Sequence, residues 1–160
     1  MSLRIVRLLN LVFVMADFGL MFAHVLEIPG KLRFTGTQWL TVQQNLYIGF
    51  GTVGAAAEVL AVATTWLLVY LTRSRRPAFA LTLSAAILMT VSFLTWFVFI
   101  DPINAVIAAS TPETLPAQWM ELRNRWETWH AIRAAMTCAA LSLLIWAILA
   151  ETHERGELVR

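Results

Sequence analysis

Two histidines and four carboxylates of this chain lie within or at the ends of long apolar stretches. His24 and Glu27 are three residues apart, as are Glu127 and His130, so each pair can direct two ligands at one point. Glu-x-x-His pairs on facing helices, joined by further carboxylates, are the ligands of di-iron and di-manganese helix bundles. Such a site suits iron, manganese, zinc or copper. The six predicted metal ligands are His24, Glu27, Glu58, Asp101, Glu127 and His130.

These side chains belong to polar stripes. Residues seven apart share one face of a helix, and an ionisable residue inside a membrane span is a functional lead by default. At 1.5 Å per residue, the candidate ligands fall in one layer, about 20 to 35 Å from the cytoplasmic end of the spans. The stripes are Asn10, Asp17 and His24; Gln44, Gly51, Glu58 and Thr65; and Arg123, His130 and Thr137.

The elements that must position these residues are membrane helices. The chain has 160 residues, of which 59% are hydrophobic and only 14% charged, which excludes an ordinary globular enzyme. A bilayer core requires about 20 apolar residues in a helix, and four stretches qualify: residues 5–27, 47–71, 77–100 and 130–150. We therefore predict an all-α fold, an antiparallel bundle of four transmembrane helices that forms a single domain over residues 1–160. The single Cys138 excludes a disulfide scaffold.

Two of the helices are predicted to be longer than the bilayer core. Thr37 and Thr114 are plausible caps, and from them the helical pattern runs to about Leu71 and Thr152. Each helix would be about 50 Å long. Helices 2 and 4 should therefore project on the outer side of the membrane.

The distribution of arginines along the chain predicts how the protein is oriented in the membrane. The side shared by both termini carries more basic residues than the other, so both termini should be cytoplasmic in a multi-pass protein of the plasma (inner) membrane. The basic residues form no stripe, so no nucleic-acid partner is expected. The arginines on the predicted cytoplasmic side are Arg4, Arg7, Arg73, Arg75, Arg76, Arg155 and Arg160, against Lys31, Arg33, Arg123 and Arg125 on the other.

A simpler interpretation competes with the metal site. Glu127 could pair with Arg123 one turn away, and Glu27 with Lys31 or Arg133. His24 could be a hydrogen-bond donor between helices. These pairs would make the polar layer a set of interhelical contacts rather than a metal centre.

Asp17 and Glu58 are harder to explain as local ion pairs. Asp17 has no basic residue within reach on its own helix, and Glu58 has none within a dozen positions. We expect each carboxyl group to be protonated or bonded across the bundle.

Four segments carry a resemblance to a known family. They are Ala23-His-Val-Leu-Glu-Ile-Pro-Gly-Lys31, Val42-Gln-Gln-Asn-Leu-Tyr47, Asp101-Pro-Ile-Asn104 and Arg125-Trp-Glu-Thr-Trp-His-Ala-Ile-Arg133. Over nearly its whole length, the chain resembles the small four-helix membrane family that includes the anthrone oxygenases. The resemblance implies a membrane bundle that oxidises polyphenolic anthrones to anthraquinones with dioxygen.

Our first interpretation is an oxygenase-like oxidoreductase acting on a lipophilic, aromatic small molecule that enters from the bilayer. Catalysis would depend on a transition metal bound by the six predicted ligands. Without a metal, His130 or His24 would act as general base and remove a phenolic proton, so that the carbanion reacts with dioxygen. The other predicted site residues are Arg125, Arg133, Gln44 and Asn104, which would orient an oxyanion or phenolic oxygen, and Trp126, which would stack on a planar ligand.

The alternative is a non-enzymatic membrane module. It would bind a small ligand, form a homo-oligomer or dock as an accessory subunit on a larger membrane complex. The polar stripes would then hold helices together, and the tryptophan-rich outer projection would be the docking surface.

Overall fold

The chain is helical throughout almost all of residues 2–157, the part that the computed structural model describes, with side chains described from Ser2 to Glu151. No strand occurs in this range, and the predicted all-α fold is confirmed. Arg160 and the side chain of Arg155, two of the predicted cytoplasmic arginines, lie outside the described residues. The elements are α1 (Leu3–Lys31), α2 (Gly36–Leu46), the π-helical turn η1 (Phe50–Gly54), α3 (Ala55–Thr72), α4 (Arg76–Thr95), the π-helical turn η2 (Trp96–Ile100), α5 (Asp101–Ala109) and α6 (Trp119–Glu157).

Four helical segments are long and apolar enough to cross a membrane. They are Leu3–Lys31, Phe50–Thr72, Arg76–Ala109 and Trp119–Glu151. Large apolar side chains point away from the bundle along their length: Leu8 is 64% exposed, Val98 61% and Trp146 67%. These side chains suit contact with lipid, so the chain is a multi-pass membrane protein.

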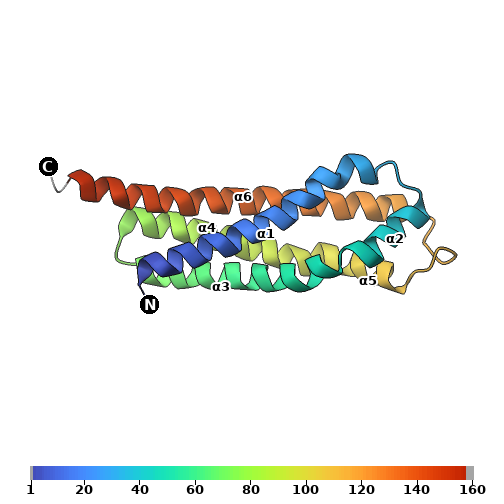
Figure 1. The fold of residues 1–160 in the computed structure, drawn as a ribbon, viewed down its shortest axis with the longest axis horizontal. Coiled ribbons are helices and arrows are strands. Elements are labelled where there is room, and N and C mark those ends of the chain that lie inside the picture. The colour runs from blue at the N-terminus through green and yellow to red at the C-terminus, as the bar shows by residue number, and fades with distance from the viewer. Residues whose placement is uncertain (1, 158–160) are drawn as a thin grey trace.

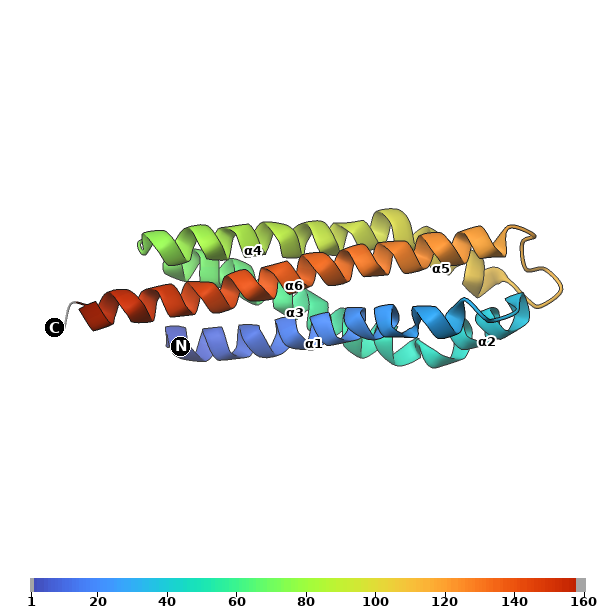
Figure 2. The ribbon, with the colours of Figure 1, turned by 90° about the horizontal axis from the view of Figure 1, so that it is seen from above.

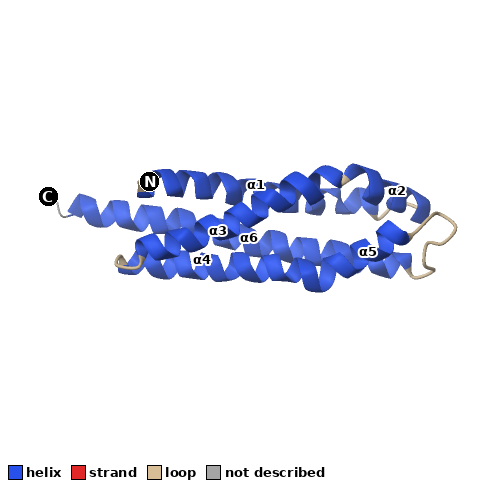
Figure 3. Cartoon of the chain, turned by 90° about the horizontal axis from the view of Figure 1, so that it is seen from below, coloured by secondary structure: helices blue, strands red, loops and turns tan. Residues whose placement is uncertain are grey.

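The spans form one elongated bundle (Figures 1 and 2). Helix α1 starts at the end where α3 turns into α4, and α3 and α6 run back towards that end (Figure 1). Helix α1 packs on α3 and α6, and α4 packs on the same two helices. Figure 3 shows that the connecting loops gather at the two ends of the bundle. How far α2 and the first turns of α6 project beyond a bilayer stays a prediction.

The helix predicted to run unbroken from Thr37 to Leu71 is interrupted, so that prediction is wrong. Helix α2 starts two residues earlier than expected, in a capping box between Thr35 and Gln38. It ends at Leu46, and the next residue, Tyr47, has a φ of −95° and a ψ of 11° that leave the helical region. A π-helical turn then follows in a glycine-rich stretch, from Phe50 to Gly54.

Helix α6 also begins differently from the prediction. Its first residue is Trp119, whereas the sequence favoured a cap at Thr114. The Thr114 hydroxyl instead accepts a hydrogen bond from the Thr111 backbone N–H at 2.8 Å, inside the preceding loop. The helix therefore starts after Pro116.

Two other helices run past the predicted span ends. Helix α1 continues through Pro29 to Lys31, and the third span continues through Pro102 to Ala109. Proline donates no backbone hydrogen bond, and the π-helical turn η2 lies just before Pro102, where the regular ladder loses a donor. Helix α1 thereby carries Lys31 one turn beyond Glu27.

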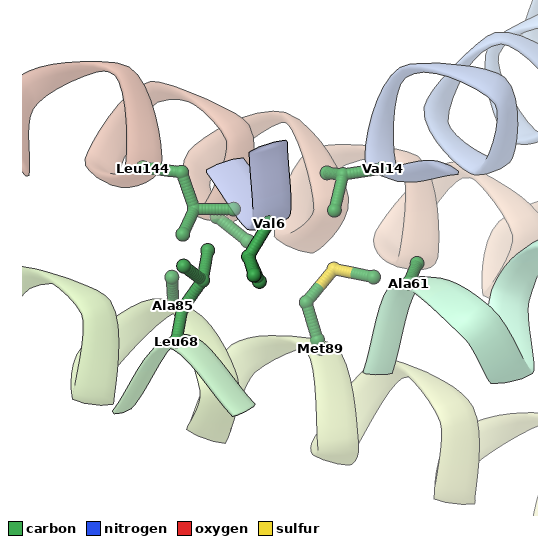
Figure 4. Close-up of a cluster of buried hydrophobic side chains, with 8 residues drawn as sticks. Val6, Val14, Ala61, Leu68, Ala85, Met89 and Leu144 are labelled. Atoms are coloured by element: carbon green, nitrogen blue, oxygen red, sulfur yellow. The ribbon is translucent and has the colours of Figure 1, made fainter. Parts of the chain in front are cut away.

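Two clusters of buried apolar side chains lie towards opposite ends of the bundle. The first, shown in Figure 4, consists of Val6, Val14, Ala61, Leu68, Ala85, Met89, Ala140 and Leu144. The second consists of Trp39, Leu40, Ile100, Ile103, Ile107 and Trp126. Small residues such as Ala61 and Ala85 are fully buried, which permits the close helix packing that stabilises membrane bundles.

Candidate functional site

The candidate site is centred on two histidines that meet inside the bundle. His24 comes from α1 and His130 from α6, and they are only 3% and 4% exposed. Their ring centroids lie 4.5 Å apart, at an angle of 68°. Residues 106 positions apart in the sequence thus place two imidazoles in direct contact.

Aromatic rings surround this pair. The His24 ring lies 4.9 Å from Tyr47, 4.7 Å from Phe50 and 4.8 Å from Trp126. Trp126 also packs on His130, with ring centroids 3.8 Å apart. Tyr47 is the residue at the helix break, and Phe50 opens the π-helical turn, so the irregular backbone places both rings against His24. We call His24, His130, Tyr47, Phe50 and Trp126 the histidine cluster.

The hydrogen bonding of His130 defines its free nitrogen. Nδ1 of His130 lies 2.9 Å from the backbone oxygen of Trp126, one turn earlier in α6. A carbonyl oxygen can only accept, so Nδ1 must carry the proton in this bond. In a neutral ring, Nε2 therefore keeps its lone pair and is available as a base.

A buried lysine lies beside the histidine cluster. Lys31 is 2% exposed, and its Nζ is 2.9 Å from Glu27 and 3.3 Å from Glu127. The same ammonium group lies 4.6 Å from the ring centroid of Trp126 and 4.8 Å from that of Tyr47. Lys31 thus joins two of the four predicted carboxylate ligands, Glu27 and Glu127, and makes cation–π contacts with two rings of the cluster.

Glu27 connects the cluster to the surface. Its Oε2 accepts a hydrogen bond from the Tyr47 hydroxyl at 2.6 Å and lies 3.5 Å from Nδ1 of His24, long for a hydrogen bond. Its side chain is 33% exposed. Burial and the hydrogen bond to Glu27 raise the pKa of Tyr47, which lies outside the membrane-spanning segments, so this phenol stays protonated.

A second buried ion pair lies deeper in the bundle. Arg133 donates from Nη2 to Glu58 at 2.5 Å and from Nε to the backbone oxygen of Ser92 at 3.1 Å. Glu58 is therefore bonded across the bundle, one of the two outcomes expected for it. Asp17 lies within electrostatic reach of both groups. Asp17 is 1% exposed, and neither of its oxygens has a hydrogen-bond partner among the described residues.

The other predicted site residues lie apart from the two histidines or act through a neighbour. Asn104 Oδ1 accepts from Trp126 Nε1 at 2.9 Å and so fixes the indole. Gln44 donates to the backbone oxygens of Ile107 and Ser110, tying α2 to the end of α5. Arg125 and Asp101 are exposed.

Among the described residues, no three His, Cys, Asp or Glu side chains form a group that could hold a metal ion. Three of the four predicted carboxylate ligands are each engaged by a cation of the protein: Glu27 and Glu127 by Lys31, and Glu58 by Arg133. An ammonium group between two carboxylates repels a metal ion from that position. This donor set does not fit the predicted metal, and it agrees with the simpler interpretation for the Glu27–Lys31 pair.

Glu127 does not pair with Arg123, the partner that the simpler interpretation favoured. Arg123 instead donates to the backbone oxygens of Lys31 and Leu32 at the end of α1. It lies over the Trp119 ring at 5.2 Å. Arg123 therefore secures the helix end that carries Lys31.

Sequence reasoning missed Lys31, Tyr47 and Phe50 as site residues. Pro29 made Glu27 appear to be the end of the span, although Lys31 is four residues further along the same helix. Tyr47 was visible only as part of a resembling segment. No sequence signal marked Phe50, because its position depends on the π-helical turn.

The fold and this buried polar layer define a multi-pass, all-helical membrane protein with a histidine and ion-pair cluster inside the bundle. A family model described as anthrone oxygenase matches residues 44–143, more than half of the chain. The chain belongs to the anthrone oxygenase family, as its sequence suggested. No curated protein and no solved structure matches it. The matched range includes His130 and Trp126 but begins after α1, which carries His24 and Lys31.

Proposed function

We propose that this protein is a membrane oxygenase that acts on a lipophilic aromatic substrate of the anthrone type, with the His24–His130 pair as its catalytic base. The observation that supports the proposal is the contact between two buried imidazoles within an aromatic surround. Membership of the anthrone oxygenase family supports the reaction class. The anthrone-type substrate and the roles of the individual residues belong to the proposal.

The first step is removal of a proton. An anthrone has a methylene group between two aromatic rings, and the anion formed by deprotonation is delocalised over both rings. In the proposed mechanism Nε2 of His130 accepts this proton, since Nδ1 of His130 is committed to the Trp126 carbonyl. The ring of His24 contacts the ring of His130, holds that ring in place and can share the proton that His130 accepts.

The second step uses dioxygen. The carbanion transfers electrons to dioxygen, a carbon–oxygen bond forms, and the resulting peroxide takes back the proton from His130. Loss of water then breaks the oxygen–oxygen bond and leaves a carbonyl group. The methylene group and one dioxygen become one carbonyl group and one water, so the substrate loses four electrons and dioxygen gains four.

The aromatic rings would bind and orient the planar substrate by stacking. Tyr47 and Phe50 pack against His24, so a substrate must displace at least one ring to reach the base. We assign this movement to Tyr47, because its backbone lies at the break between α2 and the π-helical turn. Tyr47 would swing out from Trp126, its stacking neighbour at 5.7 Å.

The proposal is tested by activity in proteoliposomes. Purified protein is supplied with a hydroxyanthrone, and dioxygen uptake and anthraquinone absorbance are recorded together. We expect one dioxygen consumed per quinone, with the rate lost in His130→Gln and strongly reduced in His24→Gln. Glu121→Gln, an exposed change on the same helix, is the matched control and should keep the rate. Equal rates in all four proteins would remove the histidines from the reaction.

The same experiment addresses the alternative function. An accessory subunit or ligand-binding module would show no dioxygen uptake, would tolerate loss of either histidine and would purify with another membrane protein. The exposed apolar faces of the spans are compatible with either lipid or a protein partner. Size-exclusion chromatography with mass detection separates a homo-oligomer from a complex.

We also propose that the end carrying Arg4, Arg7, Arg73, Arg75 and Arg76 faces the cytoplasm of a plasma (inner) membrane. Support comes from the number of arginines next to the spans at that end. The single-cysteine variants Ser2→Cys and Glu113→Cys, each in a Cys138→Ser background, give the test, because both positions are exposed at opposite ends of the bundle. A membrane-impermeant thiol reagent added to intact cells should label position 113 and not position 2.

A further inference from the structure

A cavity lies at the opposite end of the bundle from the histidine cluster. It has a volume of about 720 Å³, within the range of small-molecule binding sites. Helices α1 and α6 and the turn between α3 and α4 contribute its walls, at the end where α1 begins (Figure 1). Arg7, on this wall, and His24 are seventeen residues apart on α1, so about 25 Å separates the two regions. We call this cavity the arginine cleft.

Among its described lining residues, the arginine cleft carries more positive than negative charge. The described side chains that line it include Arg4, Arg7 and Arg75 but only one acid, Glu151, so three positive charges face one negative charge there. Glu151 binds Arg7 at 2.6 Å and Arg75 at 2.9 Å, one arginine on each oxygen. Arg4 is exposed and has no ion-pair partner among the described side chains. The net charge of these four side chains is +2.

Glu151 also organises the donors. A guanidinium group has five N–H donors. The bonds to Glu151 fix Arg7 and Arg75, and the other N–H groups of each have no acceptor among the described side chains. Because the glutamate is only 8% exposed, the two arginines are held from the protein side. This arrangement is pre-organised for a second anion on the open side of the cleft. Phosphate oxygens match guanidinium geometry through paired hydrogen bonds.

The rest of the lining is apolar and adjoins the lipid-facing surface. Leu3, Leu8, Leu11 and Ile148 complete the wall, with Ser2 at the edge. Leu8 is 64% exposed and lies on a helix that spans the membrane. Arg4 and Arg7 occupy the first turns of that span. An occupant of the cleft would therefore meet arginines at headgroup level and leucines beside its hydrocarbon.

We propose that the arginine cleft binds the phosphate headgroup of an anionic phospholipid, with the acyl chains along Leu8 and Leu11. The combination of a +2 lining, a pre-organised arginine pair and an adjoining apolar wall favours an amphiphile over a free anion. This site is independent of the oxygenase reaction. It would anchor the end of α1 to the lining residues of α6 and to the α3–α4 turn through a shared lipid.

Thermal unfolding of the detergent-purified full-length chain tests the proposal. The protein is titrated with dioleoyl phosphatidylglycerol, with dioleoyl phosphatidylcholine and with inorganic phosphate at equal ionic strength. We expect phosphatidylglycerol to raise the unfolding temperature saturably and the other two ligands to leave it unchanged. Arg4→Gln removes an arginine without breaking any ion pair between described side chains, and should raise the half-saturating lipid concentration about fivefold.

Arg76→Gln is the matched control, because Arg76 is an exposed arginine of the same turn region that does not line the cleft. It should leave the half-saturating concentration unchanged. Equal weakening in both variants would show a diffuse charge effect and overturn the site. An equal shift with inorganic phosphate would assign the cleft to a free anion and overturn the lipid proposal. No shift with phosphatidylglycerol would overturn the whole inference.

Discussion

Replacing Lys31 with methionine tests whether this buried ammonium group holds the two carboxylates of the site. The side chain is 3% exposed and lies 3.3 Å from Glu127, which is 5% exposed. At that distance and an effective dielectric constant of about 20, the attraction is about 5 kcal/mol before desolvation is counted. Removing one partner of a buried pair typically costs about 3 to 5 kcal/mol.

Glu27 contributes less to the expected loss. Its side chain is 33% exposed, so water screens its charge, and a pair of this kind contributes about 1 kcal/mol or less. The stability loss in Lys31→Met should therefore arise mainly at Glu127. We expect a decrease of about 3 kcal/mol in the free energy of unfolding.

The assay is unfolding in mixed micelles by titration with sodium dodecyl sulfate, followed by circular dichroism. The double variant Lys31→Met/Glu127→Gln removes the charge left unpaired, and should recover most of the loss. Arg33→Met, an exposed change two residues away, is the matched control, and should stay within about 0.5 kcal/mol of the parent. A loss below that of the control, or no recovery in the double variant, would refute the ion-pair account.

Three further predictions concern neighbouring groups. Asp17→Asn should change the free energy of unfolding by less than about 1 kcal/mol, because neither Asp17 oxygen accepts a hydrogen bond from the described residues and an amide has nearly the same volume as a carboxyl group. A large loss of stability in the same titration would show that Asp17 is ionised and paired. Asn104→Ala should lower the free energy of unfolding by about 1 kcal/mol and lower the oxygenase rate, because the indole N–H of Trp126 loses its hydrogen-bond acceptor. An unchanged rate would show that Trp126 does not need this hydrogen bond. After purification with a chelator, the protein should contain far less than one equivalent of iron, copper, manganese or zinc per chain and keep its activity, because Lys31 and Arg133 already engage the carboxylates. If the chelator instead removed one equivalent of metal per chain and the activity with it, the predicted metal centre would be restored.

The sequence was informative wherever one helix determines the outcome. Spacing by seven on the first span predicted one polar face, and the structure buries Asn10, Asp17 and His24 at 0%, 1% and 3% exposure. The same spacing in α6 predicted a face that includes His130, which is also buried. Helical periodicity and the length of the apolar stretches determine these buried polar faces within a single helix. They could therefore be predicted from the sequence alone.

Features that depend on helix breaks could not be predicted in this way. The Gln44 to Thr65 stripe assumed one continuous helix, but the break at Tyr47 and the π-helical turn rotate its first part away, so that Gln44 bonds to α5. Lys31 became a buried partner only because α1 continues through Pro29. Its contact with Glu127 depends on the register between α1 and α6, which no local pattern encodes.

The most direct test of the central claim separates proton removal from the reaction with dioxygen. A hydroxyanthrone is incubated with proteoliposomes in deuterated water under argon, and exchange of its methylene hydrogens is followed by NMR above the rate with empty vesicles. If the His24–His130 pair is the base, the parent protein will catalyse this exchange without dioxygen and His130→Gln will not. Exchange at the same rate in both proteins, or quinone formation in air by a parent that catalyses no exchange, would contradict the account.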